Sequence, residues 1–170
     1  MTRLGLTPVA IAWVLINAHR YNEAIQEARN VLAVKPDDAS TLGINLAWAL
    51  ILNHQAAEAI PVLEKSVSLT HRSPGVLGTL VWAYTQAGRR SDAVWLVEEL
   101  KKRQQTGYVP AAAFVFSYLG LGENDEAFAW FDRACKEQSN ILKYLKVFPP
   151  FDSLRADSRF NDLIRRVGLD

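Results

Sequence analysis

Large apolar side chains recur along the chain in short stretches of one design, each with an aromatic residue in its middle. These aromatic residues follow one another at intervals of 35, 34 and 34 residues: Trp13, Trp48, Trp82 and Phe116. A second series, an alanine after an acidic residue, keeps the same intervals about eleven residues further on: Ala24, Ala59, Ala93 and Ala127. Two independent series with one period indicate a repeated unit, and a period near 34 is typical of stacked helical hairpins.

Within each unit, apolar residues recur at three- and four-residue steps, which predicts two helices. The predicted units cover about 6–38, 39–72, 73–106 and 107–139. Their first helices are expected over about 8–19, 39–53, 74–87 and 110–120. Their second helices are expected over about 22–34, 56–69, 91–104 and 124–138. The corner between the two helices falls on His19, His54, Gly88 and Gly122, residue types that tolerate a positive φ.

The period stops after residue 139, and the last part of the chain has a different pattern. Residues 140–147 are compatible with one short helix, which Phe148-Pro149-Pro150 cannot continue. Residues 157–167 have the capping residue, apolar spacing and basic end of a final helix. Because a stacked array needs a terminal element with one apolar face, we expect the tail, 140–170, to cap the fourth unit within a single domain, 1–170.

Composition narrows the class of protein. The chain is 49% hydrophobic, contains five Trp and has a formal net charge of +1. Such a balance argues against a nucleic-acid partner, which needs a surplus of Lys and Arg on one face. The 19 residues of 39–57 lack formal charges but include Asn45, Asn53 and His54, so we expect no membrane span. The single Cys135 fits a reducing compartment, which favours the cytoplasm, with the periplasm as the alternative.

Several positions carry a resemblance to a known family. Leu80, Ala83, Tyr84, Gly88 and Ala93 of the third unit, with Pro36 closing the first, resemble the tetratricopeptide repeat over about residues 6–138. The resemblance implies an all-α, right-handed α-solenoid of four helix-turn-helix units plus a C-terminal capping segment. The sequence departs from the pattern in the closing proline, which is displaced in the second unit and absent from the third.

The tail also resembles the C-terminal ends of many bacterial tetratricopeptide segments, through Tyr144-Leu145-Lys146-Val147, Phe151-Asp152-Ser153-Leu154-Arg155, Arg159-Phe160 and Gly168-Leu169. In those proteins the segment often follows a DNA-binding, cyclase or kinase domain. The resemblance therefore implies, as an alternative function, a regulatory or oligomerising C-terminal module of a larger bacterial signalling or transcription-regulating protein, which would form a homo-oligomer.

In the family, the first helix of each unit lines the concave face, so the resemblance places the aromatic series inside a groove. We expect an apolar peptide or partner segment to bind there. The predicted groove residues are Trp13, Ile16, Asn17, Ile44, Trp48, Ile51, Trp82, Thr85, Gln86, Phe116 and Leu119. One turn back, the same face carries Val9, Ile44, Gly78 and Ala112. Two alternatives stay open: the rings pack edge to face against each other within the core, or the tail fills the groove.

The family's best-known binding mode, a clamp of Lys, Arg and Asn on a C-terminal carboxylate, does not carry over. At the positions that need cations this chain has Val9, Ile44, Gly78 and Ala112, and aromatic residues replace the Asn. A partner of apolar character is therefore expected, without a preference for acidic tails.

Residues with catalytic chemistry are sparse. His19, His54 and His71 have no spacing that would place two of them on one helical face for a metal, and Cys135 has no motif that pairs it with a base. No glycine-rich phosphate loop or nucleophile elbow occurs. We therefore expect a non-catalytic protein-interaction scaffold with no metal and no cofactor.

Overall fold

The computed structural model describes residues 7–169, and in that range the regular structure is all helical, without a strand. Residue 6, where the first predicted unit begins, and residue 170 at the end of the predicted tail lie outside the described residues. The elements are α1 Pro8–Asn17, α2 Tyr21–Val34, η1 Thr41–Leu46, α3 Ala47–Leu52, α4 Ala56–Leu69, α5 Pro74–Gln86, α6 Arg90–Thr106, α7 Ala111–Leu121, α8 Asn124–Lys136, η2 Asn140–Tyr144, η3 Pro149–Leu154 and α9 Ser158–Arg166.

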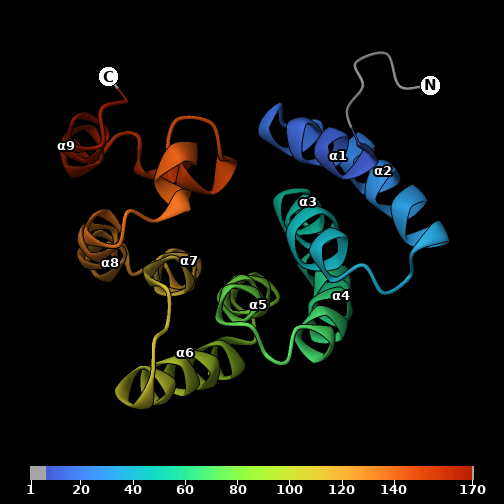
Figure 1. Ribbon diagram of the computed structural model, residues 1–170, viewed down its shortest axis with the longest axis horizontal. Coiled ribbons are helices and arrows are strands. Elements are labelled where there is room, and N and C mark those ends of the chain that lie inside the picture. Colours follow the sequence, from blue (N-terminus) through green and yellow to red (C-terminus); the bar gives the residue numbers. More distant parts are fainter. Residues whose placement is uncertain (1–6, 170) are drawn as a thin grey trace.

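Consecutive helices pack as pairs that follow one another around an arc (Figure 1). α1 packs on α2, η1 and α3 pack on α4, α5 on α6, and α7 on α8. The first helices of successive pairs also contact each other, most extensively α5 and α7. The predicted helices therefore occur with nearly the predicted ends, and each pair buries its apolar residues against the next.

The predicted corners have the backbone conformation that their residue types favour. His19 and His54 have φ of 58° and 60°, and Gly88 and Gly122 have φ of 75° and 77°. At each corner the following N–H donates back across the turn, as from Arg89 N to the Tyr84 carbonyl oxygen at 2.8 Å. This bond satisfies a carbonyl that the end of the helix would otherwise leave unpaired. The prediction of a left-handed residue at these corners is confirmed.

The first helix of the second pair occurs over 39–52, close to the predicted 39–53, but it is not a regular α-helix throughout. Thr41–Leu46 forms a π-helix, which continues directly into α3. A π-helical turn accommodates one more residue than an α-helical turn. The interval from Trp13 to Trp48 is 35 residues where the later intervals are 34, and the π-helix accounts for that extra residue. Pro61, by contrast, lies within an uninterrupted α4.

Gly78 and Gly120 allow α5 and α7 to approach closely. A Cβ on Gly78 would lie 2.5 Å from the carbonyl oxygen of Ala113, and one on Gly120 would lie 2.8 Å from the Cα of Trp82. Distances this short leave no room for any other side chain. Gly78, which was predicted to face the groove, is instead buried in the contact between α5 and α7.

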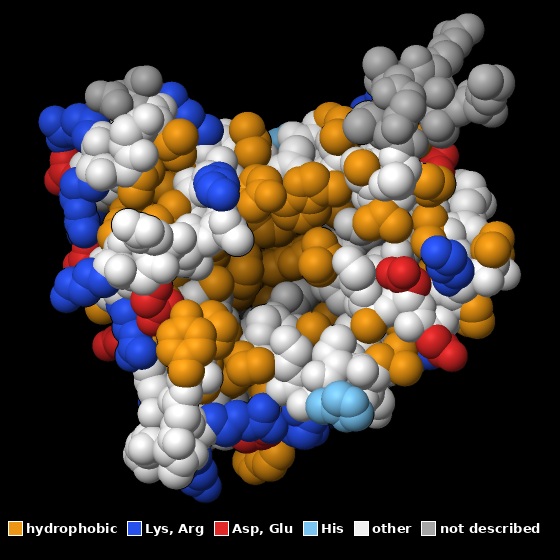
Figure 2. Space-filling view, viewed as in Figure 1, with side chains coloured by type: hydrophobic (Ala, Val, Ile, Leu, Met, Phe, Trp, Pro, Cys, Tyr) orange, Lys and Arg blue, Asp and Glu red, His pale blue; other side chains and the backbone are white. Residues whose placement is uncertain are grey.

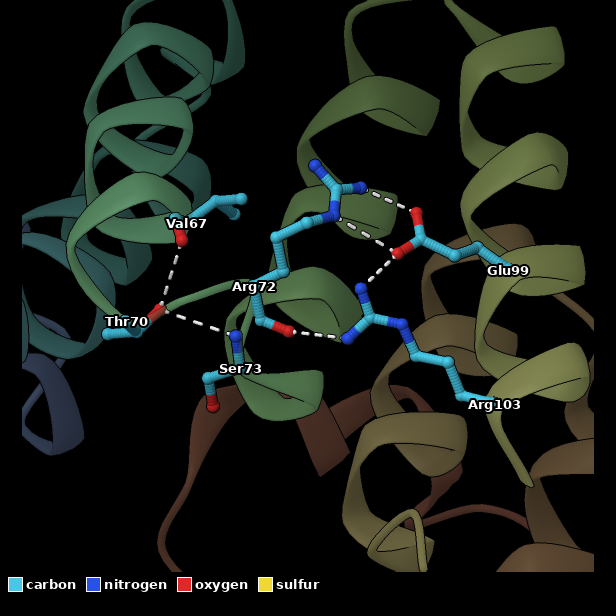
Figure 3. Close-up of polar contacts among 6 residues, drawn as sticks. All are labelled: Val67, Thr70, Arg72, Ser73, Glu99 and Arg103. Atoms are coloured by element: carbon cyan, nitrogen blue, oxygen red, sulfur yellow. Dashed lines mark hydrogen bonds and ion pairs between the residues drawn. The ribbon is translucent and has the colours of Figure 1, made fainter. Parts of the chain in front are cut away.

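Ion pairs link α6 to the turn between α4 and α5. Arg72, which precedes α5, donates to both carboxylate oxygens of Glu99 in α6 from one edge of its guanidinium group, from Nε at 3.1 Å and from Nη2 at 2.5 Å (Figure 3). Arg103 contacts the same carboxylate and donates to the Arg72 carbonyl oxygen at 2.8 Å. Burial alone would raise the pKa of Glu99, but the two guanidinium groups outweigh it and lower that pKa. The cluster fixes α6 against the α4–α5 turn.

The tail contacts both the last helix pair and the first helix. α9, at the predicted place, lies beside α8 and is joined to it by Arg159–Asp125 at 2.7 Å and Arg166–Asp132 at 2.6 Å. Residues 140–154, however, fold into two 3-10 helices, η2 and η3, and lie across the opening of the arc between α8 and α1 (Figure 1). The second of these was not expected. No helix within 7–169 combines the length and apolar character needed to cross a membrane.

Candidate functional site

The four aromatic residues of the series lie on α1, α3, α5 and α7, and three of them are joined by direct ring contacts. The Trp48 ring centroid lies 5.3 Å from that of Trp82 and 5.2 Å from that of Phe116, with interplanar angles of 75° and 59°. Trp48 is only 3% exposed, whereas Trp13, Trp82 and Phe116 are half-buried. Edge-to-face packing of this kind is favourable between aromatic rings. The alternative of mutual packing is therefore what the structure has.

The tail supplies the ring that links the first aromatic residue to the others. Phe148 lies 5.0 Å from Trp13, 5.2 Å from Trp48 and 6.0 Å from Phe116, measured between ring centroids. Tyr144 packs edge to face on Trp13 at 5.4 Å. The structure therefore combines both alternatives: the rings pack on one another, and the tail enters the groove.

Of the other predicted groove residues, the apolar ones one turn further on belong to the core. Ile16 and Ile51 are fully buried and Leu119 is 8% exposed, so these side chains are not available to a partner. A helix that packs on two neighbouring helices needs a wide apolar stripe, and these side chains are part of that stripe. Ile44, in contrast, is 47% exposed and remains free to contact a ligand.

The predicted polar groove residues bind the chain itself. Asn17 Nδ2 donates to the Trp13 carbonyl oxygen at 2.7 Å, and Thr85 Oγ1 donates to the Val81 carbonyl oxygen at 3.0 Å. In the amide orientation that satisfies both neighbours, Gln86 donates to the Ile51 carbonyl oxygen at 3.1 Å and accepts from Trp82 Nε1 at 3.0 Å. Gln86 therefore connects α5 to α3 and fixes the Trp82 ring.

A cavity of about 640 Å³ remains beside these rings, at the end of the groove where the first helices begin. The Trp13, Trp48, Phe116 and Phe148 rings contribute to its lining, and Figure 2 shows a hollow with hydrophobic side chains near the centre of this face. The lining residues are Thr7, Val9, Ala10, Trp13, Ser40, Gly43, Ile44, Asn45, Trp48, Ser73, Gly75, Val76, Thr79, Ala112, Phe116, Ser139, Asn140, Ile141, Tyr144 and Phe148.

The lining carries no Asp, Glu, Lys or Arg among the described residues. Its polar groups are neutral hydroxyls and amides, and some of these already have partners: Asn45 Nδ2 donates to the Val9 carbonyl oxygen at 3.0 Å, and Thr79 Oγ1 donates to the Gly75 carbonyl oxygen at 3.2 Å. A surface of this kind suits a ligand without charge, because a charged group would lose its hydration there without gaining a counter-charge.

Sequence reasoning found part of this lining and missed the rest. Val9, Ile44 and Ala112 were placed on the groove face, whereas Val76 and Thr79 were not. For the tail, entry into the groove was left open as an alternative, but no tail residue was named. One signal for the tail was present: Leu145, Phe148, Phe151 and Leu154 recur at three-residue steps. That step matches the 3.0 residues per turn of a 3-10 helix, and all four side chains are buried.

The histidines and Cys135 lie outside the cavity lining. His19 contacts Asp152 across the α1–η3 contact at 3.6 Å, and its Nδ1 lies 2.8 Å from the Tyr21 hydroxyl. Burial, assisted by the charge of Asp152, raises the pKa of Tyr21. Burial also raises the pKa of the Cys135 thiol, which makes the thiolate scarcer at neutral pH. Between residues 7 and 169, no group of three or more His, Cys, Asp and Glu side chains is arranged to hold a metal ion.

Comparisons with known proteins add no relative to this picture: no protein-family model matches the chain, and the searches against curated proteins and against solved structures found no match either.

Proposed function

We propose that the chain is a right-handed α-solenoid of four tetratricopeptide units that acts as a non-catalytic protein-interaction scaffold. The 34-residue period, the paired helices and the left-handed corners support the architecture. The scaffold binds an apolar segment of a partner protein, and the site is the cavity beside Trp48 and Phe148.

The observation that carries the proposal is the uncharged cavity of about 640 Å³. Ligand sites in proteins commonly measure about 300–1,000 Å³ and are mostly apolar, with a few polar groups that orient the ligand. This cavity has the same character, with aromatic rings in its wall and hydroxyls of Ser40, Ser73 and Ser139 among its lining. Apolar side chains of the bound segment contact the rings, and its backbone hydrogen-bonds to the neutral polar groups.

The residues that line the cavity also favour a binding module over an enzyme. None of the three histidines is among the cavity residues, and neither is Cys135. A general acid or base must lie within hydrogen-bond reach of the atom it protonates or deprotonates. The cavity offers recognition by burial and stacking, which is the chemistry of a peptide groove.

Peptide binding to a cavity that carries an introduced charge tests the proposal. We would titrate the full chain with uncharged nine-residue peptides that carry Trp, Phe, Leu or Ser at the centre and measure heat of binding. Ile44→Asp places a carboxylate on the exposed part of the cavity wall, and binding of the Trp, Phe and Leu peptides should weaken at least about tenfold, since burying an unpaired charge is unfavourable. Val94→Asp, on the exposed surface of α6, is the matched control and should change nothing.

The result that contradicts the proposal is equally clear. If Ile44→Asp and Val94→Asp bind every peptide as the wild type does, the cavity is not the site. Equal binding of the Ser and Trp peptides would exclude recognition of an apolar side chain.

A second candidate, self-association, rests on a different observation. Val94 and Trp95 are adjacent on α6 and are 42% and 63% exposed. Exposed aromatic residues are enriched in protein interfaces. Sedimentation velocity over a concentration series separates the two functions: a dimer that Trp95→Ser dissociates favours an oligomerising module, and a monomer at every concentration excludes it.

A further inference from the structure

Residues 140–154, named here the closing segment, occupy the part of the concave groove next to the cavity. The segment contains η2 and η3, and the side chains that face the helices are almost fully buried: Leu145 and Phe151 are 0% exposed and Phe148 is 2% exposed. A stretch outside the repeat thus fills a surface that the repeat builds.

The contacts of Phe148 describe a binding site for an aromatic ring. Its ring touches Trp13 of α1, Trp48 of α3 and Phe116 of α7, with centroid distances between 5.0 and 6.0 Å. These three rings come from different helix pairs and define what we call the ring site. Phe151 extends the contact, stacked on Phe116 at 6.1 Å with an interplanar angle of 6°.

Polar bonds hold the closing segment mainly to itself. Lys143 binds Asn140 at 2.9 Å, and Arg155, just after the segment, binds Asp152 and the Lys146 carbonyl oxygen, both at 2.8 Å. Toward α1, the contact between the Asp152 carboxylate and His19 Nε2 at 3.6 Å is solvent-exposed. Such exposed pairs contribute little to stability. The affinity of the segment for the groove therefore comes from its rings and apolar side chains.

The helix that follows the closing segment is anchored separately. α9, which follows it, is fixed to α8 by the Arg159–Asp125 and Arg166–Asp132 pairs, and Arg159 also lies 4.2 Å from the centroid of the Phe128 ring. α9 is therefore held on α8 by contacts that do not involve Phe148.

We propose that the closing segment is an internal ligand, and that a partner segment with an aromatic residue next to proline competes with it for the ring site. This inference rests on the proposed function and specifies both the chemistry of the partner and the regulation of the groove. The model for the partner is Phe148-Pro149-Pro150-Phe151, in which two prolines restrict the backbone between two rings. A restricted segment loses less conformational entropy when it binds.

The internal ligand lowers the apparent affinity of the ring site for a partner segment. A tethered segment reaches an effective concentration in the millimolar range, so a competitor binds with reduced apparent affinity. Removing the internal ring should therefore strengthen external binding, which is the opposite of what the loss of a simple core residue predicts.

The test uses a fluorescent peptide with the sequence of residues 143–152 and the full chain. Phe148→Ala empties the ring site, and the peptide should bind this variant about tenfold more tightly than the wild type. A peptide with Ala at the position of Phe148 is the control and should bind neither chain. Equal affinity for wild type and variant, or equal binding of both peptides, overturns the proposal.

A second measurement covers the case in which Phe148→Ala does not fold. Hydrogen exchange of the wild-type chain with excess peptide should show faster exchange in residues 140–154 and unchanged exchange in α9. Unchanged exchange in the closing segment at a saturating concentration of bound peptide overturns the proposal. Phe148→Leu, which keeps most of the apolar volume, should give an intermediate gain in peptide affinity.

The two proposals fail in different ways. In one outcome, uncharged peptides bind the wild type and Ile44→Asp weakens their binding, but Phe148→Ala does not raise the affinity of the 143–152 peptide. This outcome would support the proposed function and overturn the internal ligand. The 143–152 peptide could instead bind Phe148→Ala tightly and bind the double variant Phe148→Ala/Ile44→Asp equally well. That result would support the internal ligand and place the binding site outside the cavity.

Discussion

The ring of Phe148 lies 5.2 Å from the ring of Trp48 at an interplanar angle of 79°, although the two residues are 100 positions apart in the chain. This edge-to-face contact joins the middle of the helical array to its tail. Both side chains are nearly inaccessible to solvent. The concave side of the array is therefore partly core, and a ligand meets only the cavity that the tail leaves free.

Trp48→Ala should destabilise the fold strongly. Its ring contacts Trp82, Phe116 and Phe148, and truncating a buried aromatic residue costs about 3–5 kcal/mol because a cavity replaces the ring. Trp95→Ala, on the exposed surface of α6, should change the free energy of unfolding by less than about 0.5 kcal/mol. Urea unfolding followed by circular dichroism measures both. A Trp48→Ala variant as stable as Trp95→Ala would show that the central rings do not form a packed core.

Trp13→Ala should loosen the contact between α1 and the closing segment without unfolding the later helices. Trp13 is the α1 residue whose ring packs on Tyr144 and Phe148, at 5.4 and 5.0 Å. Its loss removes most of the apolar contact there, and the exposed His19–Asp152 pair cannot replace it. Hydrogen exchange should become faster in residues 140–148 and stay unchanged in α6. Protection of the segment at the wild-type level would mean that Trp48 and Phe116 hold it alone.

Much of this fold could be predicted because its signals are local. The helix starts at Thr7-Pro8 and Ser73-Pro74 and the corners at Gly88 and Gly122 depend on one or two residues each, so they can be identified without knowledge of the tertiary structure. Helical spacing fixes which side chains share a face, so the common face of the aromatic series could also be predicted. Its inward direction, by contrast, came only from the resemblance to the tetratricopeptide repeat.

The parts that were not predicted depend on contacts between distant residues. The π-helix of Thr41–Leu46 reflects one extra residue whose position a period alone cannot locate. The insertion of Phe148 depends on three rings from three helix pairs, and nothing local to the tail specifies them. Burial of Ile16 and Ile51 was missed for a similar reason, because a helix in an array packs on neighbours at both sides.

The free energy of unfolding should decrease in mild acid, partly because the Glu137 carboxylate becomes protonated. Its carboxylate accepts from the Ala111 N–H at 3.0 Å, from Arg133 at 2.8 Å and from the Tyr108 hydroxyl at 3.1 Å. Burial alone would raise the pKa of Glu137, but these hydrogen bonds together lower it below the ordinary value of 4.5. A lowered folded-state pKa stabilises the protein fully above the unfolded-state value, and that contribution is lost as the pH falls through the folded-state pKa.

Glu137→Gln provides the measurement for this pH dependence. The variant should be less stable by about 1 kcal/mol near neutral pH, because the amide keeps acceptor sites but loses the charge. The difference from the wild type should shrink as the pH falls below 4.5, the ordinary value of the Glu137 pKa. Chemical unfolding at a series of pH values gives both curves. A difference that stays constant down to about pH 3 would show that ionisation of Glu137 does not contribute.

Gly78→Ala should destabilise the chain although alanine favours helices. The new Cβ would lie 2.5 Å from the Ala113 carbonyl oxygen, so α5 and α7 must separate, and overpacking of this kind costs about 1–3 kcal/mol. Gly75→Ala in the same helix is the matched control, since no atom lies within 4 Å of its Cβ. The control should be neutral or more stable by about 0.5 kcal/mol, because alanine restricts the unfolded chain. Equal effects of the two substitutions on the urea midpoint would mean that helix propensity, and not the close approach of α5 and α7, determines the requirement for glycine.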